Sequence, residues 1–304
     1  MISLLSIAVA AGTPLLLAGL GETVVERSGI FNLGIEGTML MGAVVGFLVA
    51  DKASSAPAGA AAALAVGAAT GLVFGFFAVT AHANQVVAGL GITIAGLGVS
   101  AVIGKSLVAR PAVATFEEIA IPGLSAIPVL GEIFFEQNLL VYLGYLAAPL
   151  VWLVLMRTRP GLHLRAAGEN PDAGDAMGVS VALARYSAVV FGGALAGLAG
   201  SYFSLAFTPG WSENMTGGRG YIALALVIFA TWNPMRLLGG AFLFGTLEAL
   251  AFRAQVIGVE VPSAILGMLP FIATILVLVL IYALGAQQRL GAPRALGIPF
   301  LTRR

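Results

Sequence analysis

Long apolar segments, separated by shorter polar ones, run through almost the whole chain. Because a helix needs about 20 apolar residues to cross a bilayer, the pattern predicts about nine crossings. Their approximate limits are 3–20, 33–50, 57–80, 86–108, 137–156, 184–207, 220–232, 238–256 and 263–284. The seventh is short and the fourth is glycine-rich, so either is open to being broken or partly re-entrant. The pattern predicts an all-α polytopic membrane protein, with residues 1–304 in a single transmembrane domain.

The composition agrees with this class. Of 304 residues, 59% are hydrophobic and 10% are charged, whereas an average chain carries roughly 25% charged residues. The lack of cysteine excludes disulfides and thiolate metal sites. Small-xxx-small spacing, which lets helix backbones approach closely, favours packing within the chain over a dedicated dimer seam. It occurs at Gly42/Gly46, Gly71/Gly75 and Gly193/Gly197.

Arginine and lysine predict the orientation, because they are enriched in cytoplasmic loops. The loop at 157–185 and the tail after the last span carry four arginines each: Arg157, Arg159, Arg165 and Arg185, then Arg289, Arg294, Arg303 and Arg304. Four predicted spans separate these two regions, so both are expected on the cytoplasmic side, with the N-terminus outside. The segment at 109–136 is then an extracytoplasmic loop.

The cytoplasmic loop contains the signature of a short helix over 170–178. Asn170 is a good N-cap, and Pro171 suits the first helical position. Asp172 and Asp175 lie toward the end that favours negative charge. Gly178 can end the helix in the left-handed conformation. Such a short helix is unstable alone, so we expect its flanks or a soluble partner to hold it; a solvated connector is the alternative.

The first membrane-level polar segment is GETVVERSGIFNLGIEG, residues 21–37. An ionisable group at membrane depth normally faces a cavity or a partner. One interpretation is a broken helix whose freed backbone groups, with Asn32 and Glu36, line a solute path. The other is an ordinary interfacial turn. For Glu22 and Glu26 alone, a solvated turn is favoured.

Two other polar segments lie beside predicted spans. In His82-Ala83-Asn84-Gln85, Asn84 and Gln85 can hydrogen-bond a polar solute, but capping of the next helix is simpler. In TPGWSENMTGGRGY, residues 208–221, Trp211 and Tyr221 fit an interfacial aromatic belt. The alternative is an outer gate formed by Trp211, Asn214 and Arg219.

No nucleotide-binding motif is complete in the chain. Gly104-Lys105-Ser106 resembles the end of a P-loop, but the glycine required five positions before Gly104 is Val99, and the segment lies in an apolar span. Any ATP hydrolysis must therefore come from another chain. A convincing nucleophile–base pair for an intramembrane enzyme is also lacking.

The chain resembles the permease subunits of bacterial ABC importers for nucleosides and simple sugars, within the ribose and branched-chain amino-acid permease group. The resemblance covers nearly the whole length. It rests on GETVVERSGIFNLGIEGTMLMGA (21–43), LRAAGENPDAGDAMGVSVALARYSAVVFGGALAGLAGSY (164–202), FTPGWSENMTGGRGYIALALVIFATWNP (207–234) and APRALGIPF (292–300). It is most similar to the shorter of two paralogous permeases in nucleoside systems.

The resemblance implies a type II-like importer architecture in the cytoplasmic (inner) membrane. A second, longer permease would complete the pathway, and an extracytoplasmic binding protein would deliver the solute. Cytoplasmic ATPases, which use ATP and Mg²⁺, would dock on the 170–178 helix, so this chain would bind no cofactor itself. The docking residues would be Asn170, Pro171, Asp172, Asp175, Met177 and Gly178. From polarity and location rather than from the resemblance, we expect the solute pathway to include Asn32, Glu36, Asn84, Gln85, Trp211 and Asn214.

The rival hypothesis is a stand-alone secondary transporter or channel for a small polar solute. It requires an ion-coupling site within this chain, for which only Glu36 and Glu248 are candidates. Glu248, in a predicted span, can instead pair with an arginine that the sequence does not identify. Uptake by this chain alone, without ATP, would distinguish the two hypotheses.

Overall fold

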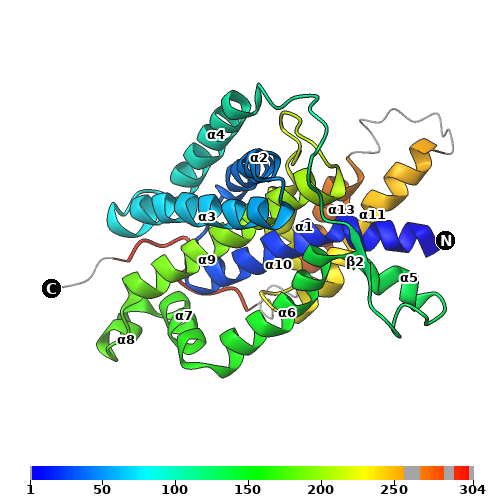
Figure 1. The fold of residues 1–304 in the computed structure, drawn as a ribbon. Helices are drawn as coiled ribbons and strands as arrows, with labels where there is room; N and C mark the ends of the chain where they lie inside the picture. Colours follow the sequence, from blue (N-terminus) through cyan, green and yellow to red (C-terminus); the bar gives the residue numbers. More distant parts are fainter. Residues whose placement is uncertain (1, 257–267, 284–290, 301–304) are drawn as a thin grey trace.

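The computed structural model describes residues 2–256, 268–283 and 291–300 (Figure 1). The α-helices are α1 (Ile2–Arg27), α2 (Ile35–Ala53), α3 (Ala56–Gly75), α4 (Gln85–Gly104), α5 (Leu130–Phe134), α6 (Leu139–Arg157), α7 (Arg159–Glu169), α8 (Pro171–Ala176), α9 (Val181–Tyr202), α10 (Arg219–Phe229), α11 (Pro234–Val256) and α13 (Leu269–Ala283). Two π-helical turns, η1 (Phe76–Thr80) and η2 (Phe203–Phe207), extend α3 and α9. Strands β1 (Glu118–Ala120) and β2 (Glu136–Asn138) pair antiparallel within the 109–138 segment.

Six helical segments in the described residues are long and apolar enough to cross a membrane. They are Ser3–Arg27, Ala56–Thr80, Gln85–Gly104, Leu139–Arg157, Val181–Phe207 and Pro234–Gln255. They match the predicted first, third, fourth, fifth, sixth and eighth spans. The chain is therefore a helical multi-pass membrane protein, and the glycine-rich fourth span is one continuous helix.

The count of about nine crossings is not confirmed. Helix α2 has 19 residues but carries Glu36, Asp51 and Lys52 near its ends. Helix α10 has only 11 residues, about 17 Å of helix, whereas the hydrocarbon core is about 30 Å thick. Helix α10 alone is therefore too short for a full crossing. The broken-span alternative fits, because the segment from the end of η2 to α11 ends where Trp232 contacts Glu26 near the end of α1. The predicted ninth span, 263–284, lies partly outside the described residues.

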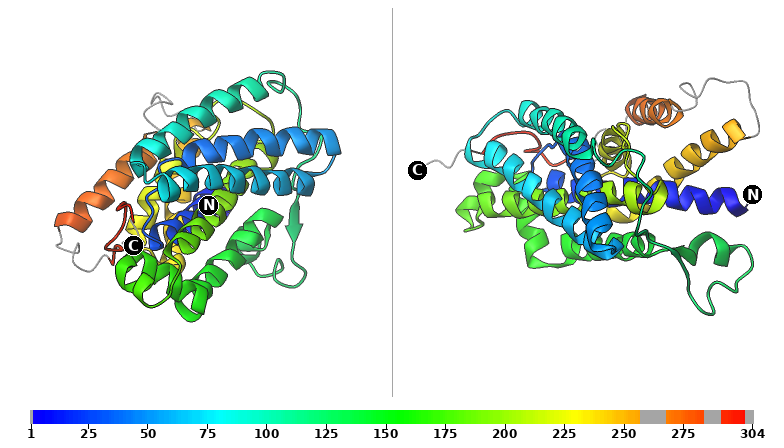
Figure 2. Two further views of the ribbon diagram at one scale, coloured as in Figure 1. Left: turned by 90° about the vertical axis from the view of Figure 1, so that its left-hand side faces the viewer. Right: turned by 45° about the horizontal axis from the view of Figure 1, so that its top comes forward.

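Helix α9 lies at the centre of the helical packing, with α1, α2 and α3 against it. Figure 2 shows α2, α3 and α4 together on one side of the molecule and α6 and α7 on the other. Glycines make these contacts close. A Cβ atom on Gly42 of α2 would lie 2.1 Å from the carbonyl oxygen of Gly197 on α9, and one on Gly67 of α3 would lie 2.2 Å from that of Gly193. The small-residue motifs therefore pack within the chain, as predicted.

This packing predicts a strong effect for Gly42→Leu. The new side chain meets backbone rather than a flexible side chain, so α2 cannot seat against α9 without a shift of both helices. We expect loss of the monodisperse peak in fluorescence-detected size-exclusion chromatography. Gly91→Leu on α4 is the matched control, because no other atom lies within 4 Å of its Cβ position. Equal profiles for the two variants would contradict this account of the α2–α9 contact.

Candidate functional site

Two non-helical segments, 28–34 and 208–218, interrupt the helical structure, and they are linked through Glu36. Glu36 lies in the first turn of α2 and is 3% exposed. Its carboxylate accepts hydrogen bonds from the Thr216 hydroxyl at 2.5 Å, the Gly218 amide at 2.8 Å and the Gly220 amide at 2.7 Å. Gly218 and Gly220 lie at the start of α10, so Glu36 joins the beginnings of two helices.

The chemistry of this junction follows from the position of Glu36 at a helix N-terminus. The first amides of a helix have no partner within the helix, and that end favours an anion. Glu36 supplies the acceptor and the charge together. Gly220 has to be a glycine here, because a Cβ atom would lie 2.8 Å from both Cα and Oε2 of Glu36. Both carboxylate oxygens accept hydrogen bonds from the protein, so Glu36 links the start of α10 to the start of α2.

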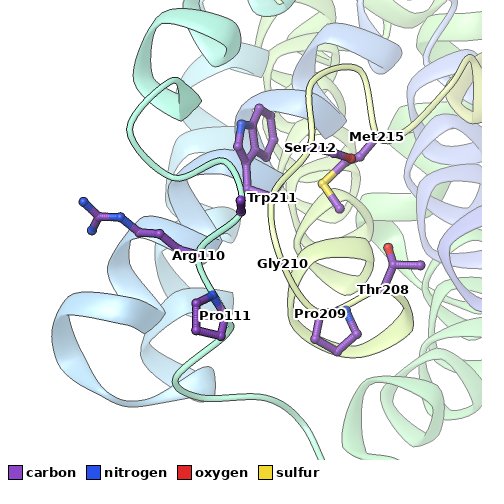
Figure 3. Close-up of a pocket in the computed structure, with 9 residues that line it drawn as sticks. Arg110, Pro111, Thr208, Pro209, Gly210, Trp211, Ser212 and Met215 are labelled. Carbon is purple, nitrogen blue, oxygen red and sulfur yellow. The ribbon is translucent and has the colours of Figure 1, made fainter.

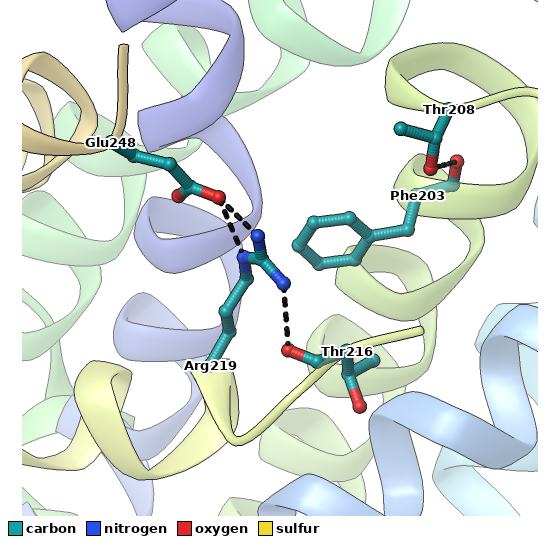
Figure 4. Close-up of polar contacts among 5 residues, drawn as sticks. All are labelled: Phe203, Thr208, Thr216, Arg219 and Glu248. Carbon is teal, nitrogen blue, oxygen red and sulfur yellow. Dashed lines mark hydrogen bonds and ion pairs between the residues drawn. The ribbon is translucent and has the colours of Figure 1, made fainter. Parts of the chain in front are cut away.

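A buried ion pair follows directly along the chain (Figure 4). Arg219 donates to Oε1 of Glu248 from both Nε and Nη2, with the Nε contact at 2.9 Å. Its Nη1 donates to the carbonyl of Thr216 at 3.1 Å. The guanidinium lies 5.1 Å from the ring centroid of Phe203, an arrangement that favours a cation–π contact. The arginine partner that the sequence left unidentified is therefore Arg219.

The position of Glu248 places this pair deep within the helical bundle. Glu248 comes 14 residues after Pro234, the first residue of α11, which is about 21 Å along the helix axis. An ion pair at such depth is costly unless both charges are matched and hydrogen-bonded. The arrangement at Arg219 meets that requirement.

We predict that replacing one partner of the Arg219–Glu248 pair destabilises the protein more than replacing both. Arg219→Met leaves an unpaired carboxylate and Glu248→Met leaves an unpaired guanidinium, each destabilising by about 3–5 kcal/mol. The double variant leaves neither charge, so its loss should be smaller than the sum of the two. The measurement is a double-mutant cycle on the thermal stability of the purified protein. Strictly additive losses would show that the two side chains do not interact.

An open pocket of about 390 Å³ lies between residues 109–111 and the 208–215 segment (Figure 3). Trp211, Pro111 and Pro209 line it, with the two prolines on different segments of the chain, while the Arg110 side chain points away. Trp211 is 5% exposed and lies against Gly104 at the end of α4. It packs with Leu40, Leu107 and Leu205, so the lipid-facing aromatic belt is wrong for this tryptophan.

The predicted outer gate is only partly assembled. Asn214 is exposed and has a φ of +56°, and its carbonyl accepts from the Gly217 amide at 3.0 Å. It therefore shapes a turn. Arg219 is held by Glu248 and Thr216 and is not among the residues that line the pocket. Of the three predicted residues, Trp211 alone lines this pocket.

The predicted helix of the 157–185 loop is present as α8. The Asn170 side chain accepts from the Ala173 amide at 3.0 Å, and Pro171 begins the helix. Gly178 has a φ of +82°, which ends the helix in the left-handed conformation. Asp172 and Asp175 are exposed, and the Met177 side chain is 84% exposed. The cap chemistry predicted from the sequence is therefore confirmed, and the helix presents two carboxylates and a thioether to the solvent.

The family model described as "Branched-chain amino acid transport system / permease component" matches residues 3–285 of the chain. The chain belongs to this permease family. The predicted resemblance is therefore confirmed, and the chain is a permease component rather than an enzyme.

Three relatives match along nearly their whole length. The chain is 40% identical to a "Putative glucose ABC transporter permease protein TsgC13" of Haloferax volcanii, over 96% of this chain and 95% of the relative. It is 34% identical to the "Guanosine ABC transporter permease protein NupQ" of Bacillus subtilis, over 99% and 98%. It is 33% identical to the "Nucleoside ABC transporter permease protein NupC" of Lactococcus lactis, over 95% and 93%. A second guanosine permease of B. subtilis, NupP, is 24% identical over 80% of this chain. No solved structure matches the chain.

The other break of the permease, 28–34, is held by side chains of α4 and by its own turn. The Gln85 side chain accepts from the Phe31 amide at 2.7 Å, and Thr93 donates to the Leu33 carbonyl at 2.9 Å. Asn32 accepts from the Gly34 amide at 2.9 Å. Asn84 instead caps α4, accepting from the amides of Val86 and Val87. The capping alternative is confirmed for Asn84, whereas Gln85 contacts the break directly.

The favoured reading of Glu22 and Glu26 as a solvated turn is wrong. Helix α1 continues to Arg27, so both residues are helical, and they are 1% and 0% exposed. Glu26 accepts a hydrogen bond from the indole of Trp232, which follows α10. Arg27 is half-buried and donates to the Trp232 carbonyl at 3.2 Å. Glu26 and Arg27 therefore contact a segment that is distant in the sequence instead of facing water.

Arg185 has a structural role that the sequence analysis did not predict. It contributes to the positive charge of the loop, yet it is 1% exposed. It donates to the carbonyls of Ser28 at 3.3 Å and Ile298 at 3.2 Å. The amides of Ala295 and Gly297 donate to the carbonyls of Gly168 and Gly29. The segment at 291–300 therefore connects the end of α1 to α7 and α9.

Proposed function

We propose that this permease is one of two unlike permease subunits of an ATP-driven ABC importer for nucleosides or related simple sugars. The supporting observation is the similarity to permeases named for guanosine, nucleosides and glucose over nearly the full length of both chains. The solute class follows from those names, and the two B. subtilis guanosine permeases support a paired arrangement.

Helix α8 is the proposed docking site for a cytoplasmic ATPase subunit, which would bind and hydrolyse ATP with Mg²⁺. The helix is capped at both ends and carries exposed Asp172, Asp175 and Met177. Figure 1 places α7 and α8 at the end of the molecule opposite the N-terminus. In the proposed topology this end is cytoplasmic, and the N-terminal end faces outward in the inner membrane. A type II-like arrangement with about nine crossings in total remains part of the proposal.

The solute pathway is proposed to follow the two helix breaks, because backbone that has left a helix at membrane depth is tolerated where it faces protein or a polar cavity. Asn32, Glu36 and Gln85 belong to the inner part through their contacts at 28–36. Trp211, with its pocket, and the exposed Asn214 belong to the outer mouth, where a binding protein would deliver the solute. Asn84 is retained only as the cap that orients Gln85.

The stand-alone transporter is the weaker candidate because its two candidate coupling carboxylates are occupied. Glu36 accepts three hydrogen bonds, and Glu248 is paired with Arg219. Uptake in liposomes that contain only this chain and no ATP would overturn the importer assignment.

The solute class is tested by competition in the assembled complex. Uptake of labelled guanosine into proteoliposomes with ATP is measured against an excess of unlabelled nucleosides, pentoses or hexoses. We expect nucleosides to compete at least tenfold better than free sugars. Stronger competition by hexoses would assign the system to sugars, as the name of the H. volcanii relative indicates for that protein.

A further inference from the structure

An apolar groove outside the proposed pathway runs between α1, α6, α7 and α9. Its volume is about 480 Å³. Hydrocarbon side chains line almost all of it, among them Val24, Ala147, Leu155, Leu164 and Phe191. The one lining side chain with a polar group is Ser187, whose hydroxyl donates to the Ala184 carbonyl at 2.8 Å. A sugar or nucleoside would find no hydrogen-bond partner there, so the groove does not belong to the solute path.

The groove reaches the end of the bundle that carries α7 and α8. Val24 lies three residues before the end of α1, and Leu155 lies two residues before the end of α6. From Ala147 to Leu155 the groove extends along α6 for about 12 Å. It therefore occupies one leaflet, and in the proposed topology this is the cytoplasmic leaflet.

Two arginines follow the lining residue Leu155 at the corner between α6 and α7. Helix α7 turns tightly against α6 there, since a Cβ atom on Gly161 would lie 2.0 Å from the carbonyl oxygen of Val154. Arg157 and Arg159 flank this corner and are exposed. The Arg157 guanidinium lies 5.8 Å from the Trp152 ring centroid, an aromatic neighbour typical of the headgroup level.

Few acidic residues lie near this basic corner along the chain, and the first after it is Glu169 at the end of α7. No aspartate or glutamate occurs between Leu139 and Gly168. Among the described residues, Arg157, Arg159 and Arg165 form no ion pair with a carboxylate, and the buried Nε of Arg165 has no hydrogen-bond partner. Exposed cations beside an apolar groove are complementary to an amphiphile with an anionic head.

The rim of the groove argues against a helix of the second permease as its occupant. Helix interfaces in membranes favour small residues at the contact. Here the exposed rim is formed by Leu150, Val154 and Phe191, and the small Ala188 is buried.

We propose that this groove binds an acyl chain of an anionic phospholipid, whose phosphate group contacts Arg157 and Arg159. The site is distinct from the solute path and from α8, and it requires no particular transported solute. The lipid would fill the space between α6 and α9, next to the junction at which α7 leads into the docking helix.

Native mass spectrometry of the full complex in nanodiscs of phosphatidylcholine and phosphatidylglycerol tests this proposal. We expect phosphatidylglycerol to be retained at least fivefold over phosphatidylcholine. The exposed double variant Arg157→Gln/Arg159→Gln should lose that preference, whereas Ala188→Leu, which fills the groove, should lose both lipids. Arg236→Gln/Arg253→Gln removes two exposed arginines elsewhere and should retain the preference. An unchanged preference in Arg157→Gln/Arg159→Gln would overturn the proposal.

A second measurement tests the lipid site without Ala188→Leu, in case that variant does not fold. The chain contains no cysteine, so Leu150→Cys has a single reactive thiol at the groove rim. Labelling by a membrane-soluble maleimide should slow at least threefold when phosphatidylglycerol replaces phosphatidylcholine. Protection that instead depends on assembly with the second permease would show a protein interface and overturn the lipid site.

Discussion

Replacing Asp172 and Asp175 together with arginine is expected to release the ATPase subunit while the permease still inserts into the membrane. Both carboxylates are exposed on α8, so they contribute little to the packing of the chain itself. Reversing a contact charge at an interface costs about 2–5 kcal/mol, which corresponds to at least a tenfold loss of recovered ATPase. The measurement is co-purification of the ATPase with tagged permease from solubilised membranes.

The matched control reverses two acidic residues at the other end of the molecule. Glu117 and Glu132 are exposed in the 109–138 segment, so Glu117→Arg/Glu132→Arg changes the net charge equally without touching α8. ATPase recovery should be unchanged. Normal co-purification with the α8 variant would show that the ATPase docks elsewhere, and equal losses in both variants would point to a general effect of charge.

Glu36→Ala is expected to destabilise the permease strongly, because three donors lose their acceptor at once. The Thr216 hydroxyl and the amides of Gly218 and Gly220 depend on this carboxylate. An unsatisfied buried donor costs about 1–3 kcal/mol, so the total is at least about 3 kcal/mol. For a chain of this size that corresponds to an unfolding temperature lower by about 6–12 °C. Differential scanning fluorimetry on the purified protein measures the shift.

Two further variants distinguish a structural role of Glu36, which links α2 to α10, from a role in the solute pathway. Glu36→Gln keeps one acceptor oxygen and should lose roughly half as much stability. Glu213→Ala removes an exposed carboxylate of the same loop and should change stability by less than about 0.5 kcal/mol. If Glu36→Ala abolishes uptake without lowering the unfolding temperature, Glu36 contacts the solute or a coupling ion and the structural role is wrong.

The long helices could be predicted from the sequence because their signal is local. The predicted segment at 184–207 is α9 with η2, and 137–156 is α6 within two residues at each end. Helix α8 could be predicted equally well, because the helix signals of Asn170, Pro171 and Gly178 depend only on neighbouring residues. The predicted span at 220–232 was already short, and its helix is shorter still because the left-handed residues Thr231 and Trp232 follow the end of α10 at Phe229.

The polar residues were harder to place because their partners are distant in the chain. Glu26 and Trp232 are 206 residues apart, and Glu36 and Gly220 are 184 apart. Periodicity gives no information on such pairs. The sequence also favoured a solvated turn for Glu22 and Glu26, because the pattern around a charged residue at the end of an apolar run is the same whether water or protein surrounds its side chain.

Hydrophobic runs and cap residues, read in the sequence alone, determined the membrane class, most of the helices and the docking helix α8, because each depends on contacts within a few residues. The tertiary structure decided that Glu36 fastens α10, that Arg219 neutralises Glu248, and that Arg157 and Arg159 flank an apolar groove. These outcomes depend on which helices meet and at what depth. That choice depends on close backbone approach at glycines such as Gly42 and Gly197, which decides which helices lie side by side and so which polar groups can meet.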